Sequence, residues 1–205
     1  MNALIIVDLQ NDFLPGGALP VPRGDEVIPL ANGLQRRFDL VLATQDWHPP
    51  DHGSFAANHP GKKPGDRIIL DGIEQILWPV HCVQNTHGAE FAPSFDRRRI
   101  AHIFHGSIPL PDRQLQHVLR QCPSRNNRAR RLLEGTLHRG DIYLLGLALD
   151  YCVKYSALDA RQLGFNTRIV VDACRGIGLE PGDLDRALDE MKRAGAILLE
   201  SRELP

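Results

Sequence analysis

Short apolar runs alternate with longer amphipathic stretches along this chain of 205 residues, and this alternation limits the folds open to it. The apolar runs are rich in β-branched residues and predict strands buried on both faces at residues 4–7, 40–44, 100–104, 142–147, 168–171 and 196–199. Helical patterns occupy residues 25–37, 132–137, 150–163 and 182–193, and Gly164 follows the third of them as a helix-ending glycine. This order predicts a three-layer α/β/α fold around a mainly parallel sheet, with ligands bound beyond the carboxyl ends of the strands.

The composition restricts the class of protein. An apolar content of 42% over this length fits one domain, residues 1–205. The net charge of −1 gives no electrostatic reason to bind nucleic acid or an anionic membrane, so the expected partner is a small neutral molecule. The first apolar run has no basic flank and stops at Asp8, which predicts neither a signal peptide nor a membrane span and favours a cytoplasmic protein. The absence of a CxxC pair predicts free thiols for the four cysteines: Cys82, Cys122, Cys152 and Cys174.

Histidine and carboxylate side chains suggest a metal site. Asp46 and His48 follow the second predicted strand and can project the same way from an extended segment, and His81 lies in the segment WPVHC. Two imidazoles and one carboxylate are a usual ligand set for a catalytic divalent metal, although His81 could equally be a hydrogen-bonded histidine of the core. Six other histidines are expected on the surface or in loops: His52, His59, His87, His102, His117 and His138. Among these, His52 is close enough to be an auxiliary ligand, and it lies in a glycine- and proline-rich stretch, 49–72, predicted to be a long functional loop.

Cys152 follows the fourth predicted strand at the start of a helix, where backbone N–H groups and the helix dipole stabilise a thiolate. This position favours a nucleophile, whereas a cysteine in an apolar segment is more often a small buried hydrophobe. Asp8 ends the first strand and could accept a thiol proton or simply cap the following turn.

The chain resembles the nicotinamidases, within the wider isochorismatase-like family of cysteine hydrolases, over nearly its whole length. The resemblance rests on five segments in order: VDLQNDFLPGGAL (7–19), TQDWHPPDHGSFAANH (44–59), WPVHCVQNTHGAEF (78–91), GLALDYCVKYSALDARQLGF (146–165) and VVDACRGI (170–177). It implies that nicotinamide is converted to nicotinate and ammonia through a thioester, as a step of NAD salvage. It also implies that Cys152 is the nucleophile, that Asp8 is its general base, and that the Leu147–Ala148 peptide is cis. Backbone N–H groups of Ala148 and Cys152 would then stabilise the oxyanion.

The same resemblance implies the binding residues. One divalent metal ion, zinc, manganese or iron, is assigned to Asp46, His48 and His81, with His52 beside them. Phe13 and Trp78 are assigned as walls that sandwich a pyridine ring. Whether the protein is a monomer or a homo-oligomer is left open.

One departure from the family concerns a catalytic lysine. Nicotinamidases carry it in an FHKG motif after the third strand, whereas here Phe104, His105 and Gly106 are contiguous. Without this cation the Asp8 carboxylate and the Cys152 thiolate repel each other, which raises at least one pKa. Lys154 is a poor substitute, because two residues beyond Cys152 on a helix it should face another way.

The departure continues in PDRQLQHVLRQCPSRNNRARR, residues 111–131, where the family has a segment like DSYSTFFDNAHR. The segment has six arginines, but no aromatic residue is interleaved for base stacking, which argues against an RNA-binding patch. Codons chosen for DSYSTFFDNAH, regrouped by one base, translate as RQLQHVLRQCPS, the residues found at 113–124. We therefore hypothesise that residues 106–131 are out of frame between two compensating insertions or deletions.

Three interpretations follow. The chain is a working nicotinamidase, a related hydrolase of another small amide, or a catalytically impaired metal-binding pseudoenzyme. The altered segment and Leu149, where the family more often has threonine, favour the second. The missing lysine favours the third.

Sequencing of the gene across the codons for His105 to Leu133 tests the frame-shift hypothesis. We expect the read to restore the lysine after His105 and a segment like DSYSTFFDN. A read that reproduces the printed residues would show the hypothesis to be wrong, and weak or absent turnover would then be expected from the missing cation.

Overall fold

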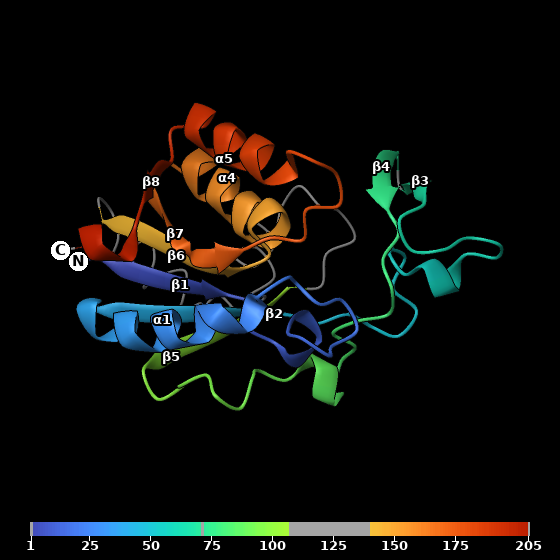
Figure 1. The fold of residues 1–205 in the computed structure, drawn as a ribbon, viewed down its shortest axis with the longest axis horizontal. Helices are drawn as coiled ribbons and strands as arrows, with labels where there is room; N and C mark the ends of the chain where they lie inside the picture. The colour runs from blue at the N-terminus through green and yellow to red at the C-terminus, as the bar shows by residue number, and fades with distance from the viewer. Residues whose placement is uncertain (1, 71, 107–139, 205) are drawn as a thin grey trace, which may run out of the picture.

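The computed structural model of the chain describes residues 2–70, 72–106 and 140–204. Its centre is a six-stranded sheet in the order β5-β2-β1-β6-β7-β8, and every neighbouring pair in it is parallel (Figure 1). The strands are β1 (Ala3–Val7), β2 (Leu40–Asp46), β5 (Ile100–Gly106), β6 (Asp141–Leu147), β7 (Asn166–Arg175) and β8 (Ile197–Leu199). All six predicted strands are present, but the predicted burial on both faces is wrong for β5 and β8, which lie at the ends of this order and include exposed residues.

Within the described ranges, three helices cover the sheet: α1 (Val27–Leu34), α4 (Lys154–Gln162) and α5 (Asp183–Arg193). The crossover from β1 to β2 through α1 and the crossover from β6 to β7 through α4 leave the centre of the sheet in opposite directions. Because such crossovers are right-handed, α1 covers one face, and α4 covers the other together with α5 (Figure 1). The predicted α/β/α architecture is confirmed. No helix in the described ranges has the length and apolar character to cross a membrane.

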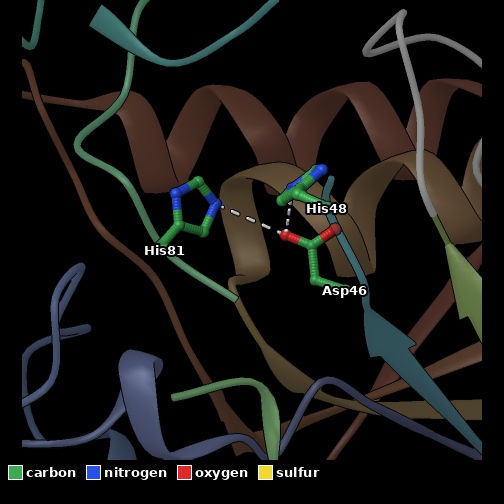
Figure 2. Close-up of side chains that lie close together, drawn as sticks. All are labelled: Asp46, His48 and His81. Carbon is green, nitrogen blue, oxygen red and sulfur yellow. Dashed lines mark hydrogen bonds and ion pairs between the residues drawn. The ribbon is translucent and has the colours of Figure 1, made fainter. Parts of the chain in front are cut away.

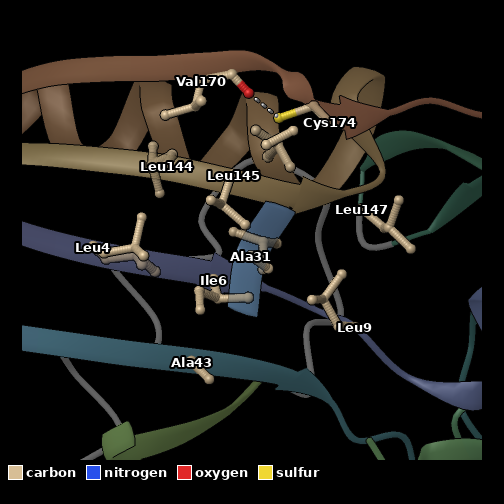
Figure 3. Close-up of a cluster of buried hydrophobic side chains, with 14 of the residues drawn as sticks. Leu4, Ile6, Leu9, Ala31, Ala43, Leu144, Leu145, Leu147, Val170 and Cys174 are labelled. Atoms are coloured by element: carbon tan, nitrogen blue, oxygen red, sulfur yellow. Dashed lines mark hydrogen bonds between the residues drawn. The ribbon is translucent and has the colours of Figure 1, made fainter. Parts of the chain in front are cut away.

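The hydrophobic core lies on both faces of β1, β6 and β7. All five residues of β1 are buried, because helices cover both sides of this central strand. Figure 3 shows Leu4 and Ile6 of β1 near Leu144 and Leu145 of β6. Cys174 is buried as a free thiol, as predicted, and donates a hydrogen bond from Sγ to the Val170 carbonyl at 3.3 Å.

The predicted helix 182–193 agrees with α5 to within one residue, whereas the predicted helix 25–37 is α-helical only over Val27–Leu34 and is flanked by 3-10 turns at Gly24–Glu26 and Gln35–Arg37. Gly164 has a φ of +85° and its N–H donates to the Arg161 carbonyl, as expected of a residue that ends α4. At the start of α4, the predicted first α-helical turn is replaced by a π-helical turn, Leu149–Val153. Such turns are frequent at functional sites, and this one contains Cys152.

The prediction of a loop for residues 49–72 is partly wrong. It contains a 3-10 turn (Ala56–Asn58) and strand β3 (Arg67–Leu70), which pairs antiparallel with β4 (Ile73–Ile76) in a hairpin beside the main sheet (Figure 1). The many glycines and prolines around it obscured a short strand whose exposed and half-buried residues alternate. The predicted helix 132–137, the histidines at 117 and 138, and Cys122 lie outside the described residues. So does the hypothesised frame-shifted segment beyond Gly106.

Candidate active site

The chemically active side chains lie at the carboxyl edge of the parallel sheet. Asp8 directly follows β1, Asp46 is the last residue of β2, and Cys152 lies in the π-helical turn after β6. Because β1 has β2 and β6 as its two neighbours, these strand ends converge. The parallel topology thus brings together residues that are 38 to 144 positions apart in the sequence.

One cavity joins the residues singled out in the sequence. Seven of them line it: Phe13, Asp46, His48, Trp78, His81, Ala148 and Cys152. Asp8 lies beneath the lining, with 2% of its surface exposed. The Leu147–Ala148 peptide at the floor of the cavity is cis, as the resemblance implied.

Asp46, His48 and His81 form a buried cluster in which one ligand atom of each lies within 4.8 Å of the others (Figure 2). His48 Nε2 lies 2.9 Å and His81 Nε2 lies 3.4 Å from the same Asp46 oxygen, Oδ2. His81 Nδ1 donates to the Pro79 carbonyl at 2.7 Å, a contact that directs Nε2 toward the cluster. His48 Nδ1 is buried without a hydrogen-bond partner in the part of the chain that the structure describes.

The charges of this cluster are mutually dependent. Burial alone would raise the pKa of Asp46, but the charges and hydrogen bonds of His48 and His81 outweigh it and hold that pKa below its ordinary value. Burial likewise opposes the protonation of His81, yet the bonds and charge of Asp46 keep its pKa above the usual one. A buried anionic oxygen that faces two imidazole nitrogens is a donor set suited to a divalent cation.

His52, expected on the surface or as an auxiliary ligand, is buried. Its ring centroid lies 4.2 Å from that of His48, and its Nδ1 lies 2.7 Å from Ser54 Oγ. His52 thus lies in a loop, as expected, but it is not on the surface. His52 packs against the cluster without belonging to the set of three.

Asp8 is linked to both Thr44 and Cys152. Thr44 Oγ1 donates to Asp8 Oδ1 at 2.5 Å, and the Cys152 side chain also hydrogen-bonds to this carboxylate. Burial, followed by the negative charge of Asp46, raises the pKa of Asp8 to about 7, although the two hydrogen bonds act in the opposite direction. Asp8 therefore holds a proton more readily than an ordinary aspartate, which suits a group that must both accept and return a proton.

No lysine or arginine in the described ranges is among the groups that shift the pKa of Asp8, so none takes the place of the missing lysine. The charges that most affect Asp8 there are those of Asp46 and His81. Lys154 Nζ pairs with Glu190 at 3.2 Å and lies 4.6 Å from the Tyr155 ring centroid, so it points away from Asp8 as predicted. His105, in the altered FHG segment, stacks on Trp47 with a centroid separation of 4.7 Å.

The cavity wall contains residues that the sequence reading missed: Leu19, Ser54, Gln75, Tyr151, Tyr155 and Ile177. The ring of Tyr151 meets that of Trp78 edge-on at 5.0 Å. Tyr151 and Tyr155 are four residues apart and flank Cys152, so helical spacing was a signal that could have identified both. Gln75 lies in β4, a strand that the sequence did not predict, which explains why it was not found.

Comparison with known proteins gives consistent matches. The model of the isochorismatase domain family matches residues 2–203. A nicotinamidase from Escherichia coli is 44% identical over 96% of this chain and 93% of its own length. The structure of a nicotinamidase/pyrazinamidase from Acinetobacter baumanii superposes with a TM-score of 0.87 at 39% identity, covering 100% of this chain and 98% of the other. A pyrazinamidase from Pyrococcus horikoshii, solved in complex with zinc, has a TM-score of 0.74 at 37% identity, with coverage of 97% and 98%.

Alkylation should distinguish Cys152 from the other two described cysteines. Burial raises the pKa of Cys174 to about 12 and that of Cys82 well above its ordinary value, so both remain protonated thiols. Cys152 is half-buried and lies at a helix start beside a proton acceptor. Treatment with iodoacetamide followed by peptide mapping should label Cys152 at least about tenfold faster than either. Equal rates at the three sites would contradict an activated Cys152, and Asp8→Asn should slow labelling of Cys152 alone.

Proposed function

The chain belongs to the isochorismatase family, and we propose that it hydrolyses the carboxamide of nicotinamide to nicotinate and ammonia. The observation that carries this proposal is the hydrogen bond between Cys152 and a buried carboxylate, Asp8, at the floor of a cavity that also contains the Asp46, His48 and His81 cluster. Nicotinamidase relatives at up to 44% identity over most of the chain support the substrate.

The covalent step uses Asp8 and Cys152. Asp8 accepts the thiol proton, and the thiolate attacks the carboxamide carbon to give a tetrahedral intermediate. Backbone N–H groups of Ala148 and Cys152 would stabilise its oxyanion, each at about 3 kcal/mol. Asp8 then returns the proton to the leaving amine, and a thioester remains on Cys152. Water, deprotonated by Asp8, hydrolyses this thioester to nicotinate and the free thiol.

Asp46, His48 and His81 would hold one divalent metal ion, with His52 packed against them. Two imidazoles and a carboxylate accept zinc, manganese or iron, and the zinc in the Pyrococcus pyrazinamidase supports a divalent ion. When bound, the ion can coordinate a pyridine nitrogen or lower the pKa of a water. His81 keeps its Nε2 available by donating from Nδ1 to Pro79.

Aromatic side chains would orient the ring of the substrate. Phe13 and Trp78 both line the cavity, and Tyr151 meets Trp78 edge-on. Apolar walls also exclude bulk water from the thioester, and they fix the carboxamide close to Cys152 in a productive geometry.

A second candidate is a catalytically impaired metal-binding pseudoenzyme. It is favoured by the direct succession of Phe104, His105 and Gly106 without the lysine, together with Lys154 being paired to Glu190 instead. The third candidate is a hydrolase that acts on another small amide. We further propose that residues 1–205 form a single domain. The protein would be cytoplasmic and would act in NAD salvage.

An ammonia-release assay with nicotinamide tests the proposed activity. We expect turnover by the metal-loaded protein, and a loss of at least about 1,000-fold in kcat/KM in Cys152→Ser. Cys174→Ser is the matched control, because its hydroxyl can still donate to the Val170 carbonyl and it should keep near-parental activity. Absence of ammonia with protein of verified mass would exclude the proposed activity and favour the pseudoenzyme.

The pH dependence tests the role of Asp8 as base. Since protonated Asp8 cannot accept the thiol proton, kcat/KM should fall as the pH is lowered through the pKa of Asp8. Thr44→Val removes a hydrogen bond that lowers this pKa, so the acidic limb of the profile should move to higher pH by about one unit. A limb that stays in place, or moves to lower pH, would contradict this role.

A further inference from the structure

Gln10 lies two residues beyond Asp8 and is fully buried, with 0% of its surface exposed. Its side-chain amide makes three hydrogen bonds. Oε1 accepts from the Asp46 backbone N–H at 2.8 Å, and Nε2 donates to the Asp46 carbonyl at 2.7 Å and to the Ala89 carbonyl at 2.8 Å. One side chain therefore holds both backbone polar groups of Asp46.

These contacts replace a missing strand neighbour. The ladder between β1 and β2 ends at the pair Ile6 and Ala43, so Asp46 extends beyond β1 while still paired to β5 through Gly106. On the β1 side, the amide of Gln10 supplies the donor and the acceptor that a strand would have supplied. The carboxylate of Asp46 thus projects from a backbone fixed on both sides.

Asp12, two residues further, acts in the same way on the segment that contains His81. Its Oδ2 accepts from the Cys82 N–H at 2.7 Å, and Cys82 has a φ of +45°, a left-handed conformation that is unfavourable for a side chain of this kind. The fit is close, because a Cβ at Gly88 would lie 2.0 Å from Asp12 Oδ2. The Cys82 carbonyl in turn accepts from the His48 N–H at 3.0 Å.

The hydrogen bonds close a ring. It runs from Gln10 to Asp46, along the chain to His48, across to Cys82, and through Asp12 back along the chain to Gln10. All three members of the metal cluster lie in this ring or directly beside it, since His81 precedes Cys82.

We propose that Gln10 and Asp12 are positioning residues of the metal site, which fix the backbones of Asp46, His48 and His81 so that their ligand atoms converge before a divalent ion binds. The inference rests on the metal site of the proposed function. Residues that orient metal ligands in this way contribute substantially to affinity, and their loss typically weakens binding about 10- to 100-fold. Neither Gln10 nor Asp12 needs to touch the ion.

A matched control separates positioning from plain stability. Gln45 is also buried, its Nε2 donates at 2.9 Å to the same Ala89 carbonyl that Gln10 uses, and its Oε1 lies 3.1 Å from His105 Nε2. Among the described residues, its side chain makes no hydrogen bond to the backbone of Asp46, His48 or His81. Gln45→Met and Gln10→Met each remove a bond to Ala89 and keep a similar side-chain volume. Both should lower the melting temperature, whereas Gln10→Met alone should disturb Asp46.

The experiment measures the dissociation constant for Zn²⁺ on the full-length protein by competition with a chromophoric chelator, with Asp46→Ala as the background for binding to thiols. Circular dichroism verifies folding of each variant. We expect Zn²⁺ affinity about 10- to 100-fold weaker in Gln10→Met and within about twofold of the parent in Gln45→Met. Asp12→Asn, which keeps the shape of the side chain, should also weaken Zn²⁺ binding and serves if Gln10→Met does not fold.

Parental affinity in Gln10→Met would overturn the inference while leaving the metal site intact, as would equal losses in Gln10→Met and Gln45→Met. If Gln10→Met does not fold, parental affinity in Asp12→Asn has the same meaning. If the unsubstituted protein binds Zn²⁺ no better than Asp46→Ala, the metal site itself fails and the inference fails with it.

Discussion

Two carboxylates are buried at the ends of adjacent strands, Asp8 after β1 and Asp46 at the end of β2, and the site depends on how their repulsion is resolved. His48 and His81 hold Asp46 in its ionised form. Burial raises the pKa of Asp8 to about 7, because the hydrogen bonds from Thr44 and Cys152 stabilise its ionised form less than burial destabilises it. One carboxylate is thus a permanent anion suited to a cation, and the other is a proton acceptor beside a thiol. Environments that separate the pKa values of two acids in this way identify their roles.

The fold makes this arrangement possible because β1 is covered on both faces. Its five buried residues leave Asp8 and the segment beyond it at the centre of the carboxyl edge, between the ends of β2 and β6. In the segment from Asp8 to Phe13, Asp8 is the proton acceptor and Phe13 lines the cavity. Gln10 hydrogen-bonds to the backbone of Asp46, and Asp12 accepts a hydrogen bond from the backbone N–H of Cys82. A short stretch of chain therefore connects the nucleophile to the metal cluster, so a displacement of this stretch should disturb both.

Much of the fold could be predicted from the sequence because buried parallel strands and amphipathic helices have distinct periodicities. The position of Asp8, Asp46 and Cys152 after strands was enough to group them, since parallel strand ends share one edge. The roles of Gln10 and Asp12 were not visible, because their partners lie 36 and 70 residues away and are backbone groups without a residue signature. Gln75 was missed with its strand, and the burial of His52 was not foreseen because its packing against His48 and Phe55 is a tertiary effect.

The most direct test of the central claim is mass spectrometry of the protein quenched with acid during turnover of nicotinamide. The account predicts one nicotinoyl group in thioester linkage, confined to the peptide that contains Cys152, and no adduct in Cys152→Ser. The intact mass measured in the same experiment tests whether the polypeptide has the mass expected from the given sequence. Steady turnover with an adduct on another cysteine, or continued turnover by Cys152→Ser, would contradict the account.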